Sequence, residues 1–130
     1  MKGSCLCGAV VFEVISPFIS ASVCHCEQCR KSHGGRGAAY GSCVKEDVVW
    51  LTGKKRIRRF ASSERVRRGF CKDCGCGIYY YNKDFPNHID IALGVMDCDP
   101  NIEPEKHIYV AEKSCWYHLN DDLPKFEKDG

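Results

Sequence analysis

Short apolar segments with alternating or β-branched residues recur along the chain, and turn residues separate them. The predicted strands cover residues 9–15, 55–60, 65–70, 78–81, 88–93 and 107–110, with turn signals at 51–53, 74–77, 85–87 and 98–100. A short helix is predicted over 27–33, where Gly34 and Gly35 would end it. The pattern therefore predicts a mostly β fold of many short antiparallel strands with one or two short helices.

Length and composition indicate one globular domain that covers residues 1–130. The 130 residues are 44% hydrophobic and 28% charged, and no linker, repeat or low-complexity tract divides them. A formal net charge of +2 is too small to indicate a nucleic-acid-binding protein by itself. No apolar run approaches the roughly 18 residues of a membrane span, so no membrane partner is expected.

The cysteine content is unusual for a domain of this size. There are 11 cysteines, an odd number, and eight of them fall in three tight clusters. The first 15 residues lack a credible export signal, because Glu13 interrupts the apolar run that follows Lys2. We therefore expect a cytoplasmic protein in a reducing compartment, where clustered cysteines usually bind metal rather than form disulfides.

Two cysteine pairs have the spacing of a structural zinc site. Cys5 and Cys7 lie two residues apart, so an extended segment points both sulfurs to one side, and Cys71 and Cys74 form a C-x-x-C turn followed by Gly75. Four thiolates would complete a zinc tetrahedron and tie the N-terminal strand to the middle of the chain. The alternatives are idle thiols or a redox C-x-x-C pair, although the βαβ context of such a pair is missing.

A second cluster, Cys24, Cys26 and Cys29, places three thiols within six residues. Three ligands leave one position of a zinc tetrahedron open, as in catalytic sites. Three thiolates also suit the exchange of a soft thiolate better than the activation of water. The alternative is a second structural site with its fourth ligand elsewhere, and the candidates are His25, His33, Cys43, Cys76, Cys98 and Cys115.

Residues 54–68 carry eight lysines and arginines, opposed only by Glu64. The favoured interpretation is the solvated face of two adjacent strands, where positive charge discourages edge pairing. An anion site for carboxylates or phosphates is a second possibility. Nucleic-acid binding is the least favoured, because no recognised motif or long basic tail accompanies the charge.

Three cysteine blocks carry a resemblance to a known family. The blocks are residues 3–10 (GSCLCGAV), 24–31 (CHCEQCRK) and 70–75 (FCKDCG), and residues 104–110, Lys113, Trp116 and 122–124 add a weaker C-terminal pattern. In this order they resemble the glutathione-dependent formaldehyde-activating enzyme (GFA) family. The resemblance spans nearly the whole chain, from about residue 3 to residue 126.

The resemblance implies a compact Mss4-like β fold with two zinc ions per chain. By it, Cys5, Cys7, Cys71 and Cys74 correspond to the structural zinc ligands. Cys24, Cys26 and Cys29 correspond to the ligands of the active-site zinc. The implied activity is that of a carbon–sulfur lyase, S-(hydroxymethyl)glutathione synthase, whose partners are the thiol glutathione and the aldehyde formaldehyde.

Two thiols depart from the family pattern and leave an alternative open. Cys76 follows Gly75, where the family often has a small hydroxyl residue, and Cys98 also replaces a residue that is commonly not a thiol. If Cys76 closed the second site, the chain would be a non-catalytic zinc-stabilised binding module for protein or nucleic acid. If the site is open, His25 and His33 are the adjacent candidates for a proton donor.

Overall fold

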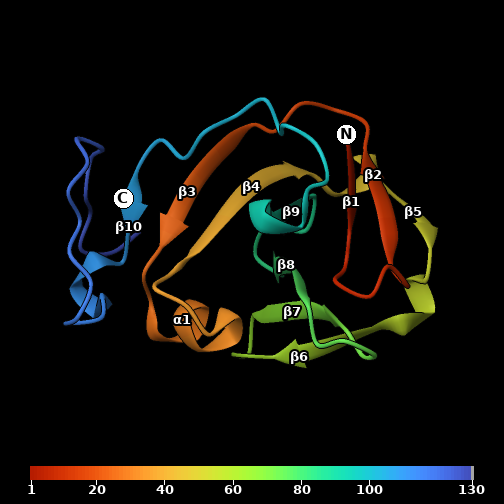
Figure 1. Cartoon of the computed structure of the whole chain (residues 1–130), viewed down its shortest axis with the longest axis horizontal. Helices are drawn as coiled ribbons and strands as arrows, with labels where there is room; N and C mark the ends of the chain where they lie inside the picture. The colour runs from red at the N-terminus through yellow and green to blue at the C-terminus, as the bar shows by residue number, and fades with distance from the viewer. Residues whose placement is uncertain (130) are drawn as a thin grey trace.

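The computed structural model describes residues 1–129, which form two β-sheets, one α-helix and four 3₁₀ helices (Figure 1). The small sheet has the order β1-β2-β5: β1 (Lys2–Ser4), β2 (Val11–Val14) and β5 (Val48–Thr52). The large sheet has the order β10-β3-β4-β9-β8-β7-β6: β10 (His107–Ile108), β3 (Ser20–Cys24), β4 (Ala38–Val44), β9 (His88–Ala92), β8 (Gly77–Asn82), β7 (Val66–Cys71) and β6 (Ile57–Ala61). The helix is α1 (Glu27–His33), and the 3₁₀ turns are Lys45–Asp47, Lys54–Arg56, Leu93–Val95 and Val110–Glu112. Within these residues no helix is long and apolar enough to cross a membrane.

The main core draws on both sheets. Phe12 and Val14 of the small sheet belong to the same buried cluster as Ile89 and Ile91 of the large sheet. Side chains alternate along a strand, so the residues between these isoleucines point to the other face of the large sheet. That second face carries several polar residues and lines the cavity described below.

The predicted mostly β fold and the short helix are confirmed, with one correction to the sheet. Helix α1 covers Glu27–His33 and ends at Gly34, whose left-handed φ of 61° suits glycine. The strands are not all antiparallel, because β10 pairs in parallel with β3. Parallel neighbours need a long connection, and here the chain from β4 to β9 lies between β3 and β10 in the sequence.

Four strands were absent from the sequence-based prediction, namely β1, β3, β4 and β5. Strands β3 (SASVC) and β4 (AAYGSCV) carry small and polar residues because one of their faces lines a cavity rather than the core. The predicted strand over 55–60 begins later, at Ile57, because Gly53 adopts φ 74° and the next three residues form a 3₁₀ turn. Where a sheet face borders a cavity, the apolar alternation that marks a strand is lost.

Candidate metal centres

The first candidate centre joins two turns that lie far apart in the sequence. The sulfurs of Cys5, Cys7, Cys71 and Cys74 all lie within 4.8 Å of one another. Cys7 Sγ is 3.6 Å from Cys5 Sγ and 3.8 Å from Cys71 Sγ. A tetrahedron with metal–sulfur bonds of about 2.3 Å has sulfur–sulfur edges of about 3.8 Å, so this donor set fits a zinc ion.

Backbone amides support the sulfurs of this first centre. The Val10 N–H donates to Cys5 Sγ at 3.3 Å. The backbone N–H of Cys76 lowers the pKa of Cys74 to about 6, which favours the thiolate that a metal requires. Gly75, with φ 75°, provides the turn in which this amide faces the sulfur.

The second candidate centre is local and lies where β3 passes into α1. Cys24 ends β3, Cys26 is the N-cap of α1, and Cys29 lies in the first turn. Cys26 Sγ accepts a hydrogen bond from the Cys29 backbone N–H at 3.3 Å, which folds the three sulfurs together. All three lie within 4.8 Å of one another, and no fourth Cys, His, Asp or Glu among residues 1–129 joins them.

The six residues considered as a fourth ligand all have other surroundings. Cys43 is buried in the main core, Cys76 packs beside the first centre, and Cys98 and Cys115 are exposed. His25 Nε2 lies 2.8 Å from His107 Nδ1, and His33 Nε2 lies 2.5 Å from the Tyr40 hydroxyl. Within the described part of the chain, none of these residues is therefore placed to be a fourth ligand of the second centre.

Arg68, which the sequence analysis placed on a solvated strand face, is buried beside the second centre. Its side chain is only 7% exposed, unlike most of the basic residues around it. Both terminal nitrogens donate to Cys29 Sγ at 3.6 Å, and one of them also lies 3.5 Å from the Tyr40 hydroxyl. The guanidinium stacks over Tyr80 at 5.2 Å, and its Nε donates to Ser62 Oγ at 3.1 Å. A buried cation beside three thiolates offsets the surplus negative charge of such a centre.

The sulfurs themselves are electrostatically coupled. Hydrogen bonds from Cys24 and Cys29 lower the pKa of Cys26, and the Arg68 charge acts in the same direction. Hydrogen bonds with Cys26 and Cys29 raise the pKa of Cys24. A divalent cation would replace these shared protons and allow all three groups to be thiolates.

A cavity of about 780 Å³ opens beside the second centre. The three cysteines, Arg68 and Tyr40 lie at its wall. Its floor is the polar face of the large sheet, with Ser20, Ser22, Ser42, Tyr80, Asn82 and Asp90. The volume is of the size that small-molecule sites use, and the polar side chains of its floor suit a guest with polar groups.

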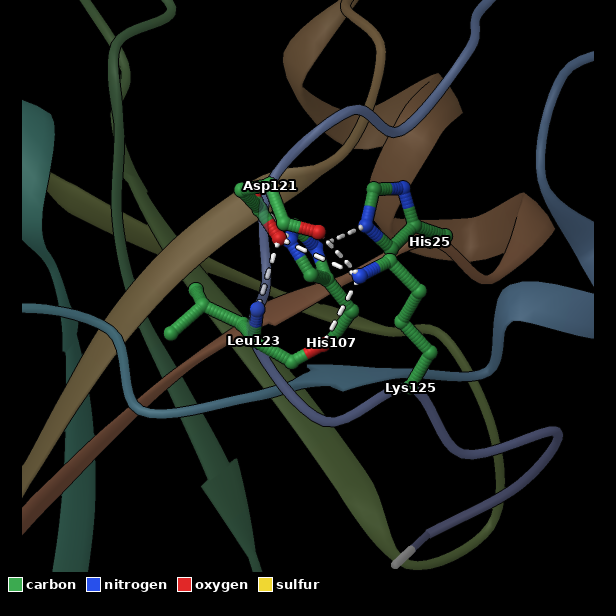
Figure 2. A network of polar contacts seen from close by, with 5 residues as sticks. All are labelled: His25, His107, Asp121, Leu123 and Lys125. Atoms are coloured by element: carbon green, nitrogen blue, oxygen red, sulfur yellow. Dashed lines mark hydrogen bonds and ion pairs between the residues drawn. The ribbon is translucent and has the colours of Figure 1, made fainter.

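Neither histidine considered as a proton donor lines this cavity. The His25 ring instead bonds to His107 (Figure 2). His33 touches the cavity only through Tyr40, whose hydroxyl it contacts. No local pattern indicated Tyr40 or His107, because partners such as Arg68 and Asp121 are distant in the sequence and come together only in the fold.

Comparisons with known proteins agree with this architecture. The sequence profile of the glutathione-dependent formaldehyde-activating enzyme family matches residues 1–112. A protein of Halomonas elongata named "Putative glutathione-dependent formaldehyde-activating enzyme" is 27% identical over 126 residues, covering 92% of this chain and 80% of its own. An uncharacterized lyase of Schizosaccharomyces pombe is 27% identical over 128 residues, covering 98% of this chain and 91% of its own. A Rhodobacter sphaeroides protein of known crystal structure shares the fold, with a TM-score of 0.63 and 23% identity over 80% of this chain and 92% of that one.

Proposed function

The chain belongs to the glutathione-dependent formaldehyde-activating enzyme family, and from this premise we propose that it is a zinc-dependent carbon–sulfur lyase that joins glutathione to formaldehyde. The observation that carries the proposal is the second centre, where three sulfurs meet at the wall of a cavity without a fourth protein ligand in the described chain. We assign Cys24, Cys26 and Cys29 to the catalytic zinc, and Cys5, Cys7, Cys71 and Cys74 to a structural zinc within a single domain.

In the proposed reaction the thiol sulfur attacks the carbonyl carbon of the aldehyde. A sulfur–carbon bond forms, the carbonyl π pair moves to oxygen, and the proton lost by the thiol ends on that oxygen. A zinc ion held by the three cysteines would keep the thiol deprotonated at neutral pH, where a free thiol is mostly protonated. Arg68 and Tyr40 are the chain's own groups beside this position.

Tyr40 is the candidate for the proton step. One terminal nitrogen of Arg68 lies 3.5 Å from the Tyr40 hydroxyl and 3.6 Å from Cys29 Sγ. The phenol therefore lies close to the sulfur cluster. The hydroxyl also forms a hydrogen bond with His33 Nε2, so His33 can exchange a proton with Tyr40 from outside the cavity. Arg68 would stabilise the alkoxide oxygen until that proton arrives.

The proposed guest and location follow from the same chemistry. The polar cavity floor can hydrogen-bond the amides and carboxylates of a thiol peptide, and its volume exceeds what formaldehyde alone would need. Seven thiols must stay reduced to bind metal, so we expect the protein to work in the reducing cytoplasm.

The proposal is tested by exchange NMR on the zinc-loaded protein with labelled formaldehyde and glutathione. We expect interconversion of S-(hydroxymethyl)glutathione and its components to exceed the uncatalysed rate, with a larger enhancement for glutathione than for 2-mercaptoethanol. Metal analysis should give two zinc ions per chain. A folded protein with two ions that leaves both exchanges at the background rate would refute the lyase and leave the metal-stabilised binding module.

Replacing Arg68 with methionine should lower kcat/KM of the exchange about tenfold or more, because Arg68 is assigned to the alkoxide and a buried hydrogen-bonded charge contributes roughly 1.5–3 kcal/mol. Arg68→Lys keeps the charge and should recover part of the loss. The measurement is kcat/KM from the exchange assay, with metal content and circular dichroism as controls for folding. An unchanged kcat/KM in a folded, two-zinc Arg68→Met protein would contradict this role.

A further inference from the structure

Two buried histidines and a carboxylate form a polar chain behind the second centre (Figure 2). His25 Nε2 lies 2.8 Å from His107 Nδ1, and His107 Nε2 lies 2.8 Å from Asp121 Oδ2. The two rings are 1% and 3% exposed, although they come from positions 82 residues apart. An arrangement of this kind links a metal-binding loop to a distant segment through directional bonds.

His25 lies between two of the three cysteines of the second centre, and its ring is tightly packed. It stands between Cys24 and Cys26 in the sequence, and its backbone N–H donates to the Ile108 carbonyl at 3.0 Å. Its ring is enclosed by His107, by Tyr117 with centroids 6.1 Å apart, and by the backbone at residue 37. A ring held on three sides fixes the backbone that carries it, and with it the two cysteines that flank it.

Glycine at position 37 is part of the same enclosure. A Cβ added there would lie 2.8 Å from the Cys24 carbonyl oxygen and 3.2 Å from His25 Nδ1. Any larger residue would press on the cysteine loop from the side opposite His107. The loop is thus closely packed on one side and hydrogen-bonded on the other.

The carboxylate at the end of the chain is itself fixed. Asp121 Oδ1 accepts hydrogen bonds from the Leu123 backbone N–H at 3.1 Å and from Lys125 Nζ at 3.3 Å. Its bond to His107 lowers the pKa of Asp121, so it stays ionised and acts as an acceptor. An acceptor at this end places a proton on His107 Nε2, and the contact between His107 Nδ1 and His25 Nε2 holds a further proton between the two rings.

From this geometry we infer that His107 and Asp121 are positioning residues that set the orientation of the Cys24–Cys26 loop through His25. Asp121 lies beyond residue 112, where the family match ends, so the C-terminal segment contributes to the second centre without touching the ion. The inference rests on the proposed metal site and deepens it. Its consequence is a difference in metal affinity at one centre alone.

The test compares His107→Leu with His107→Asn and with wild type. Leucine removes both bonds, whereas the asparagine amide carries both an acceptor and a donor and can take the place of Nδ1 toward His25. Zinc affinity is measured by competition with a chromophoric chelator, and cobalt is used to record the thiolate and d–d absorption of each centre. We expect His107→Leu to weaken the second ion by about 10–100-fold and to shift its cobalt bands, with the first ion unchanged.

His107→Asn should retain most of the affinity, whereas a role in packing alone would make it no better than leucine. Asp121→Asn is the second variant, because its half-exposed site tolerates substitution, and it should weaken the second ion several-fold. Wild-type affinity and cobalt bands in the folded His107→Leu and Asp121→Asn proteins would overturn the inference and leave the lyase proposal intact. A wild-type protein that takes only one cobalt ion would overturn both.

Discussion

Replacing Cys26 with serine is expected to release the second zinc ion and to lower the rate of glutathione–formaldehyde exchange by about 30-fold or more. A thiol with a pKa near 8.5 is only about 3% thiolate at pH 7, so loss of the ion that holds it deprotonated costs about that factor before any loss of positioning. Cys26 is also the N-cap that folds the cluster, since its sulfur accepts from the Cys29 N–H. Serine keeps this cap and removes the soft ligand.

The measurement combines metal analysis with exchange NMR on the same sample. One zinc ion per chain should remain, held by the first centre. The matched control is Cys115→Ser, an equal change at an exposed cysteine outside both centres, which should keep two ions and full activity. A Cys26→Ser protein that retains its rate enhancement would refute the catalytic role of the second centre.

Replacing Cys71 with alanine is expected to unfold the domain. Cys71 is fully buried and supplies one of four sulfurs that join the turn after β1 to the turn after β7. Structural zinc contributes on the order of 10 kcal/mol to folding in small zinc domains, and whole domains are stable by only about 5–15 kcal/mol. The loss of one ligand therefore removes most of the net stability.

Cys43→Ala is the matched control for this change. Cys43 is equally buried and belongs to the same core cluster, but it lies in neither centre, so the substitution removes the same atom without a metal bond. It should cost about 1–2 kcal/mol, as a small cavity does. Thermal and urea unfolding give both values, and similar losses for the two variants would show that the first centre adds no stability.

The local motifs were the part of the site that the sequence could predict. Spacing predicted that the sulfurs of Cys24, Cys26 and Cys29 would lie together and that Cys5 and Cys7 would meet a distant C-x-x-C, and the structure brings both sets within 4.8 Å. The helix over 27–33 was likewise predicted from its glycine stop. These signals are encoded within a few residues of one another.

The rest depends on pairings between distant strands. Arg68 is buried because β7 lies between two other strands of the large sheet and the Arg68 side chain contacts Cys29. In the sequence, Arg68 cannot be told apart from the exposed arginines near it. The His25–His107 contact requires β10 to lie parallel to β3, which no local pattern specifies. Tertiary pairing decided both outcomes.

The two centres differ in how much chain each one spans, and this has a consequence for synthesis on the ribosome. The sulfurs of the second centre emerge together within six residues, whereas Cys7 waits for Cys71, 64 positions later. The nascent chain can therefore capture an ion locally long before the two distant turns can meet. Until Cys71 and Cys74 have been translated, the early thiols at Cys5 and Cys7 remain without their partners and exposed to oxidation.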